Sequence, residues 1–133
     1  MKTSELIGSA LNHAVHIALG LGYRRDEKYG SMYFRPSQAP HVIAWDSSPP
    51  PYSTDWPQGG PIIEREKISV WLAMDDIFKK DTWAASYSYM DGDLVCEPEQ
   101  EYWGHTPLIA AMRCYVASKL GEEVEIPEEL KGE

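Results

Sequence analysis

The feature that most constrains the fold is a segment near the end of the chain that would be apolar on almost every side as a helix. Residues 108–120 read LIAAMRCYVASKL, preceded by Thr106 and Pro107 and followed by Gly121. Threonine caps helix starts, proline suits the first helical position, and glycine favours the left-handed conformation that ends helices. A helix that is apolar all round is covered on more than one side. We therefore expect this helix to lie between a β-sheet and another part of the chain, either an N-terminal helix or the proline-rich loop.

Arg113 stands in the middle of this predicted helix. A buried guanidinium has to be paired, because an unpaired one costs several kcal/mol. The segment 52–66 offers the nearest spare carboxylates and contains the turn residues that would let it fold back along the helix. We therefore expect Arg113 to form an ion pair with Asp55, Glu64 or Glu66.

A second helix is predicted at the N-terminus, capped by Thr3 or Ser4 and ended by Gly20. At 100° per residue its apolar positions share one broad face, made of Leu6, Ile7, Ala10, Leu11, Ala14, Val15, Ala18 and Leu21. His13 and His16 point away from this face, so we expect both on the surface of the protein. Their spacing suits a metal ion, but no third ligand is evident, and we predict no metal site.

The aromatic residues are concentrated in the middle of the chain, which indicates β-structure there. Of the 15 aromatic residues, 14 lie within 23–103, and aromatic side chains favour the half-buried surface of a sheet. Short β-forming segments separated by turns predict antiparallel strands at 31–34, 41–45, 67–74, 82–90 and 93–96, with a polar turn at 22–28 and a hairpin turn at Asp91-Gly92. We predict an α+β fold, a single domain over residues 1–133 in which a small antiparallel sheet packs with an N-terminal and a C-terminal α-helix.

The segment 52–66, YSTDWPQGGPIIERE, is the most unusual loop of the sequence. Its Ser, Thr and Asp oxygens suit turns, Gly59-Gly60 leaves backbone amides uncovered, and Pro61 is placed to open a short helix. Uncovered amides before a helix start bind anions. The loop therefore predicts a site for a small ligand with a negative or carbonyl end, and a purely structural loop is the alternative. The candidate ligand-binding residues are Tyr52, Ser53, Thr54, Asp55, Trp56, Gly59, Gly60, Thr106 and Arg113.

Charge and composition exclude several classes of protein. The formal net charge is −9 and the pI is near 4.8, so the chain lacks the overall basic character of nucleic-acid binders, and we expect no direct nucleic-acid binding. Six glutamates against one lysine make residues 122–133 an acidic tail, which we expect to be solvated. No apolar run approaches the ~20 residues of a membrane span, and the two cysteines fit a reducing compartment. We expect a cytoplasmic protein that does not contact membranes.

No catalytic or cofactor motif stands out. The sequence contains no GxSxG, HExxH, GxxxxGK[ST] or GxGxxG pattern. We therefore expect no cofactor and assign no catalytic residue, and the sequence gives no positive support for enzymatic activity.

Three segments of the chain resemble one known family. They are MKTSEL at 1–6, STDWPQGGPIIERE at 53–66 and TPLIAAMRCYVASKLGEEVEIP at 106–127. They are similar to the NinX-like family of phage and prophage proteins, from the nin region of lambdoid and P22-like phages. The resemblance implies a non-structural accessory protein made in the bacterial host cytoplasm. Because the function of that family is unknown, it implies no activity and no catalytic residue.

Three functions stay open at this point. The one we prefer is the binding of a host or phage protein, which suits a small accessory protein. The first alternative is a small-molecule binder, in which the Gly-Gly-Pro loop holds or sequesters a nucleotide-like anion. The second is an acidic mimic of nucleic acid, ranked last because the acids cluster in a tail and are not spaced over a folded face. The oligomeric state is not predicted.

Overall fold

The computed structural model describes residues 1–35, 44–74, 81–87, 90–91, 94–95 and 101–131. The elements, in chain order, are η1 (Thr3–Glu5), α1 (Gly8–Ala18), β1 (Tyr23–Asp26), β2 (Gly30–Arg35), β3 (Ala44–Asp46), α2 (Trp56–Glu66), β4 (Ser69–Met74), β5 (Asp81–Ser86), β6 (Met90–Asp91), β7 (Leu94–Val95), β8 (Tyr102–Gly104), α3 (Pro107–Leu120) and η2 (Glu128–Leu130). The α+β class and the helices near both ends confirm the prediction. The cap predicted at Thr3 or Ser4 is wrong, because α1 begins at Gly8, after the short helix η1, and its N-cap is Ile7.

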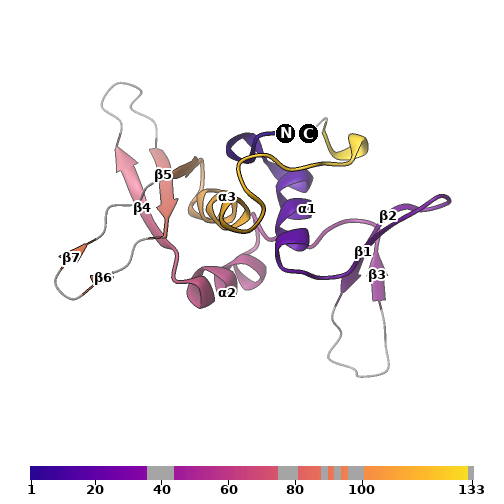
Figure 1. The fold of residues 1–133 in the computed structure, drawn as a ribbon, viewed down its shortest axis with the longest axis horizontal. Coiled ribbons are helices and arrows are strands. Elements are labelled where there is room, and N and C mark those ends of the chain that lie inside the picture. Colours follow the sequence, from indigo (N-terminus) through magenta and orange to yellow (C-terminus); the bar gives the residue numbers. More distant parts are fainter. Residues whose placement is uncertain (36–43, 75–80, 88–89, 92–93, 96–100, 132–133) are drawn as a thin grey trace.

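Helix α3 lies at the centre of the molecule (Figure 1). It packs against α1, α2 and all three strands of the sheet β4-β5-β8. The Thr106 hydroxyl oxygen accepts a hydrogen bond of 3.1 Å from the Ile109 amide at the start of the helix, and Gly121 follows its end with a φ of +92°. The helix therefore has the predicted ends and the predicted position, covered on several sides by apolar surface.

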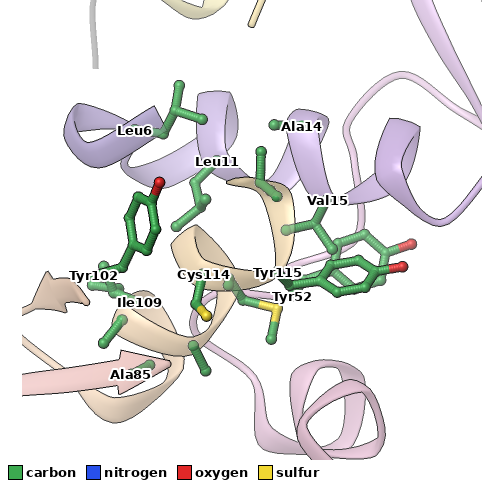
Figure 2. Close-up of a cluster of buried hydrophobic side chains, with 14 of the residues drawn as sticks. Leu6, Leu11, Ala14, Val15, Tyr52, Ala85, Tyr102, Ile109, Cys114 and Tyr115 are labelled. Atoms are coloured by element: carbon green, nitrogen blue, oxygen red, sulfur yellow. The ribbon is translucent and has the colours of Figure 1, made fainter. Parts of the chain in front are cut away.

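The core forms where these elements meet α3. In Figure 2, Leu11 and Val15 of α1 approach Cys114 and Tyr115 of α3, and Ile109 lies toward the sheet. These side chains are buried, and burial raises the pKa of the Cys114 thiol to about 12. Since a thiol with this pKa stays protonated at neutral pH, Cys114 behaves as a small apolar side chain.

In the described residues, the strands form two three-stranded antiparallel sheets, β1-β2-β3 and β4-β5-β8, and a short pair β6-β7. Helix α2 and the segment before it separate β3 from β4 along the chain, so the strands are divided between two sides of the molecule (Figure 1). Residues 41–43 of the predicted strand 41–45 lie outside the described part of the chain. The same holds for residues 88–89 of the predicted strand 82–90, for residues 92–93 at the predicted hairpin turn, and for residue 96 at the end of the predicted strand 93–96. In the hairpin, Asp91 pairs with Leu94 and so belongs to β6 instead of the turn.

The polar turn predicted at 22–28 is wrong, because residues 23–26 form strand β1. This strand pairs with β2 from Tyr23↔Tyr33 to Asp26↔Gly30. The Asp26 carboxylate accepts the amides of Lys28 at 2.7 Å and Tyr29 at 3.1 Å, which closes the turn between the two strands. The sequence of β1, YRRD, has no alternation of apolar and polar residues that would predict a strand. Tyr23 is the one aromatic residue in it.

The prediction of surface histidines is also wrong. His13 and His16 are only 4% and 0% exposed, because the β1-β2 hairpin and Tyr52 cover their flank of α1. His13 Nδ1 lies 2.6 Å from the Tyr33 hydroxyl. His16 Nε2 donates to the Gly22 carbonyl at 3.0 Å, and its Nδ1 then accepts from the Tyr52 hydroxyl at 2.9 Å. The side of α1 that carries His13 and His16 therefore contacts other parts of the chain through buried hydrogen bonds.

The acidic tail is only partly a solvated end. Val124 and Ile126 are buried in the core, and Met1 and Val124 exchange backbone hydrogen bonds of 2.9 and 3.0 Å. Further along, the Glu129 carboxylate accepts from the Ser31 hydroxyl at 2.9 Å and lies 3.2 Å from Arg25. The tail thus joins the N-terminus to the sheet β1-β2-β3.

The buried histidines make a prediction for stability as a function of pH. Burial lowers the pKa of His13 from 6.5 to about 4, with a smaller contribution from His16, and burial also lowers the pKa of His16. In the unfolded chain these imidazoles take up protons as the pH falls below 6.5, which favours unfolding until the folded-state pKa is passed. We expect His13 alone to lower the free energy of unfolding by about 2 kcal/mol between pH 7 and pH 5, measured by urea denaturation.

A matched pair of variants tests this assignment. His13→Gln removes the titrating group, so the difference in unfolding free energy between pH 7 and pH 5 should shrink by that amount. His105→Gln changes an exposed histidine and should keep the wild-type difference. Equal pH dependence in His13→Gln and the wild type would contradict the prediction.

Candidate functional site

The first part of the predicted site, Tyr52 and Ser53, holds the segment before α2 against α1. Both residues are buried. The Asn12 side-chain oxygen accepts the Ser53 amide at 2.9 Å and the Ser53 hydroxyl at 2.8 Å, while the Tyr52 hydroxyl binds His16. Burial raises the pKa of Tyr52 to about 12, so this hydroxyl stays a hydrogen-bond donor. The polar groups of these two residues are engaged within the protein.

The glycine pair lies inside a helix, so the prediction of a loop with uncovered amides is wrong. Helix α2 begins at Trp56, five residues before Pro61, and the Gly59 amide donates to the Asp55 carbonyl at 2.9 Å. Asp55 occupies the N-cap position without a side-chain cap, next to Thr54, and the Trp56 side chain is 53% exposed. Amides that are bonded along a helix cannot cradle an anion, so the local basis for a ligand site at Gly59 and Gly60 is lost.

Gly59 is instead the point where α2 meets its neighbours. A Cβ at this position would overlap the Tyr52 carbonyl oxygen and lie 2.7 Å from a methyl carbon of Leu108. Only glycine lets α2 approach the start of α3 this closely, and Ile62 on the next turn is buried against the same core. The tertiary contact explains why a helix forms despite two glycines and Pro61, which are poor helix formers.

Arg113 does not pair with Asp55, Glu64 or Glu66, so that prediction is wrong. Its Nε donates to the Leu6 carbonyl at 2.8 Å and its Nη1 to the Trp103 carbonyl at 2.6 Å. The reason is that α2 packs on another side of α3, where Glu66 lies 3.6 Å from Lys119.

Arg113, on helix α3, therefore binds main-chain carbonyls of two other parts of the chain. One is the junction between η1 and α1, and the other is the edge strand β8. Within the described part of the chain, no carboxylate oxygen lies within 4 Å of the guanidinium. Burial lowers the pKa of Arg113, and no described carboxylate lies close enough to oppose this effect. Two of its five N–H groups are used in these bonds.

A groove runs beside β8, and Arg113 lines one end of it. This Arg113 end has a volume of about 220 Å³ and also contains Ser4, Thr82, Trp103 and His105. The hollow next to it, which we call the acidic end, has about 450 Å³ and is lined by Lys2, Ser4, Glu101, Tyr102, Glu122 and Glu123. Because Ser4, Glu101 and Tyr102 line both hollows, they form one groove between β8 and the N-terminal segment. We call it the β8 groove.

The sequence did not point to this groove, apart from Arg113. Trp103 is 43% exposed and stands on the outer face of its sheet, in register with Ala84 and Trp71. Strand β8 has only three residues, too few to show a period of two in the sequence. Thr106 caps α3 close to the groove without lining it. The ligand-binding role of the other predicted residues stays a prediction.

In the described residues, no group of three or more His, Cys, Asp or Glu side chains is placed to hold a metal ion. Among the same residues, no helix combines the length and the apolar character needed to cross a lipid bilayer.

Comparison with protein families gives a match over most of the chain. The sequence profile of the family described as "Bacteriophage P22, NinX" matches residues 2–119. Comparison with curated proteins gives no match. The match covers every element from η1 to nearly the end of α3, including Arg113 and both walls of the Arg113 end of the groove.

The two glycines of α2 make a paired prediction for stability. Gly59→Ala should lower the free energy of unfolding by about 1–3 kcal/mol, because its Cβ overlaps backbone that cannot move away easily. Gly60→Ala should raise it by about 0.5–1 kcal/mol, since its Cβ would lie 3.5 Å from Trp56, an ordinary contact, and alanine favours helix. Chemical denaturation of the two variants measures both effects. If Gly59→Ala were as stable as Gly60→Ala, the close approach of α2 to Tyr52 and Leu108 would be disproved.

Proposed function

The chain belongs to the phage NinX family, and on that premise we propose that it is an accessory protein that acts by binding a host or phage protein in the bacterial cytoplasm. The proposed binding surface is the β8 groove. The observation that carries the proposal is the half-buried Arg113 guanidinium, which lines the groove beside the exposed indole of Trp103 and has no carboxylate partner in the described part of the chain. Arginine and tryptophan are enriched among the residues that dominate the energy of protein interfaces.

The shape and the charges of the groove favour a polypeptide over a small molecule. Sites for small ligands enclose most of the ligand surface. The β8 groove is bordered by exposed side chains, among them Glu101, Trp103 and His105, and carries charges of both signs along its length. The nucleotide-like alternative rested on the amides of the Gly-Gly-Pro loop, and these residues are helical.

The acidic mimic of nucleic acid gains no support from the tail. Such a mimic needs carboxylates spaced over a folded face. In the tail, Val124 and Ile126 are buried between exposed glutamates, and Glu129 is engaged with Arg25. The protein-binding function therefore has the better physical basis.

The proposal predicts that Trp103 is needed for partner binding and that Trp56 is not. Trp56 is a matched control, because it is similarly exposed but lies on α2, outside the groove. Truncation of a tryptophan that is an interface hot spot costs about 2 kcal/mol or more, so Trp103→Ala should weaken binding about thirtyfold. The measurement is chemical cross-linking in infected bacterial cells that express the tagged full chain, followed by mass spectrometry and a binding assay with the purified partner.

The wild type and Trp56→Ala should recover the same stoichiometric partner, and Trp103→Ala should lose it while melting within a few degrees of the wild type. Recovery of that partner by Trp103→Ala, or the lack of any stoichiometric partner, would refute the proposed function.

A further inference from the structure

The two ends of the β8 groove differ in charge. The Arg113 end has a guanidinium, with His105 and the Ser4 hydroxyl on its walls. Glu101 lines both ends, and the acidic end adds Glu122 and Glu123 against one lysine. A polyanion such as a nucleotide chain would be attracted at one end and repelled at the other, so the groove is complementary to a ligand that carries one charge of each sign some distance apart.

The Arg113 end suits a carboxylate. The guanidinium is a planar fork that binds carboxylates through two parallel hydrogen bonds. Its bonds to the Leu6 and Trp103 carbonyls hold the fork in position at 2.8 and 2.6 Å, and they leave three N–H groups without a bond inside the described part of the chain. A ligand carboxylate would supply the negative charge that no described residue places within 4 Å of Arg113.

The acidic end suits a basic side chain. Glu101, Glu122 and Glu123 are exposed, and Lys2 is the basic residue that lies among them. The volume of about 450 Å³ there is larger than the 220 Å³ at Arg113, so an extended chain has more room beyond the point where its carboxylate is held.

We propose that the β8 groove recognises an extended peptide segment of its partner that places a carboxylate on Arg113, packs a side chain against Trp103, and places a lysine or arginine beside Glu122 and Glu123. The inference rests on the proposed function and specifies the partner by its chemistry. The carboxylate comes either from a free C-terminus or from an aspartate or glutamate side chain of the segment.

The test uses two random peptide libraries presented to the purified full chain, one with free C-termini and one in which the random segment is internal. The wild-type protein should select peptides with an acidic group and a lysine or arginine at a fixed separation. Selection in only the free-end library assigns the terminal carboxylate, and selection in the internal library assigns a side chain. No enrichment in either library, or enrichment of peptides without an acidic group, would overturn the inference.

Two variants assign the two ends of the groove. Arg113→Lys keeps the charge but loses the fork, and we expect it to bind the selected peptide about tenfold more weakly. The double variant Glu122→Gln and Glu123→Gln should lose the preference for a basic residue and keep the requirement for the carboxylate. Unchanged affinity in Arg113→Lys, or an unchanged basic preference in the double variant, contradicts the assignment.

The peptide itself provides a test that does not depend on a folded Arg113 variant. Amidation of its terminal or side-chain carboxylate should weaken binding to the wild type at least tenfold, and an amide that binds equally well would overturn the inference.

Inorganic phosphate and adenosine monophosphate serve as competitors, and displacement of the peptide by either at concentrations where acetate has no effect would favour a phosphate ligand instead. If cross-linking finds a Trp103-dependent partner and the libraries select nothing, the inference fails and the proposed function stands.

Discussion

The structure depends on one constraint, which is that helix α3 is apolar on nearly every side and has to be covered all round. Eight of its residues are buried, and α1, α2 and the sheet β4-β5-β8 each cover part of its surface. The described side chains that pack around α3 belong to one hydrophobic cluster. The other elements occupy the positions that bury α3, even where their own sequences are poor helix formers, as in α2 with Gly59, Gly60 and Pro61.

Arg113 shows how such a helix accommodates a charge. Main-chain carbonyls carry partial negative charge and satisfy hydrogen-bond donors, yet they do not neutralise a guanidinium as a carboxylate does. Binding to the carbonyls of Leu6 and Trp103 therefore fastens α3 to the N-terminal segment and to the edge of a sheet, and it leaves a positive charge at the wall of a groove. The same two bonds hold parts of the fold together and position Arg113 at the proposed binding surface.

The second feature on which the architecture rests is the polar contact along α1. Asn12, His13 and His16 bind Ser53, Tyr33 and Tyr52, respectively, so one side of the helix holds both the sheet β1-β2-β3 and the segment that leads into α2. Hydrogen bonds of this kind need defined partners and geometry, unlike apolar contacts, and they fix how the outer sheet is oriented against the core.

The sequence by itself determined what depends on local chemistry. Threonine, proline and glycine at the ends of α3, the apolar face of α1 that carries Leu11 and Val15, and the β-formers of β2, β4 and β5 act within a few residues, so the α+β class and most element positions could be predicted. Only the tertiary structure decided the partners of Arg113, His13 and Gly59, because each depends on segments that lie far away in the sequence. Packing against those segments buried the side of α1 that carries His13 and His16, and it let α2 form through two glycines and a proline. Packing also placed Trp103, Arg113 and the acidic end along one groove.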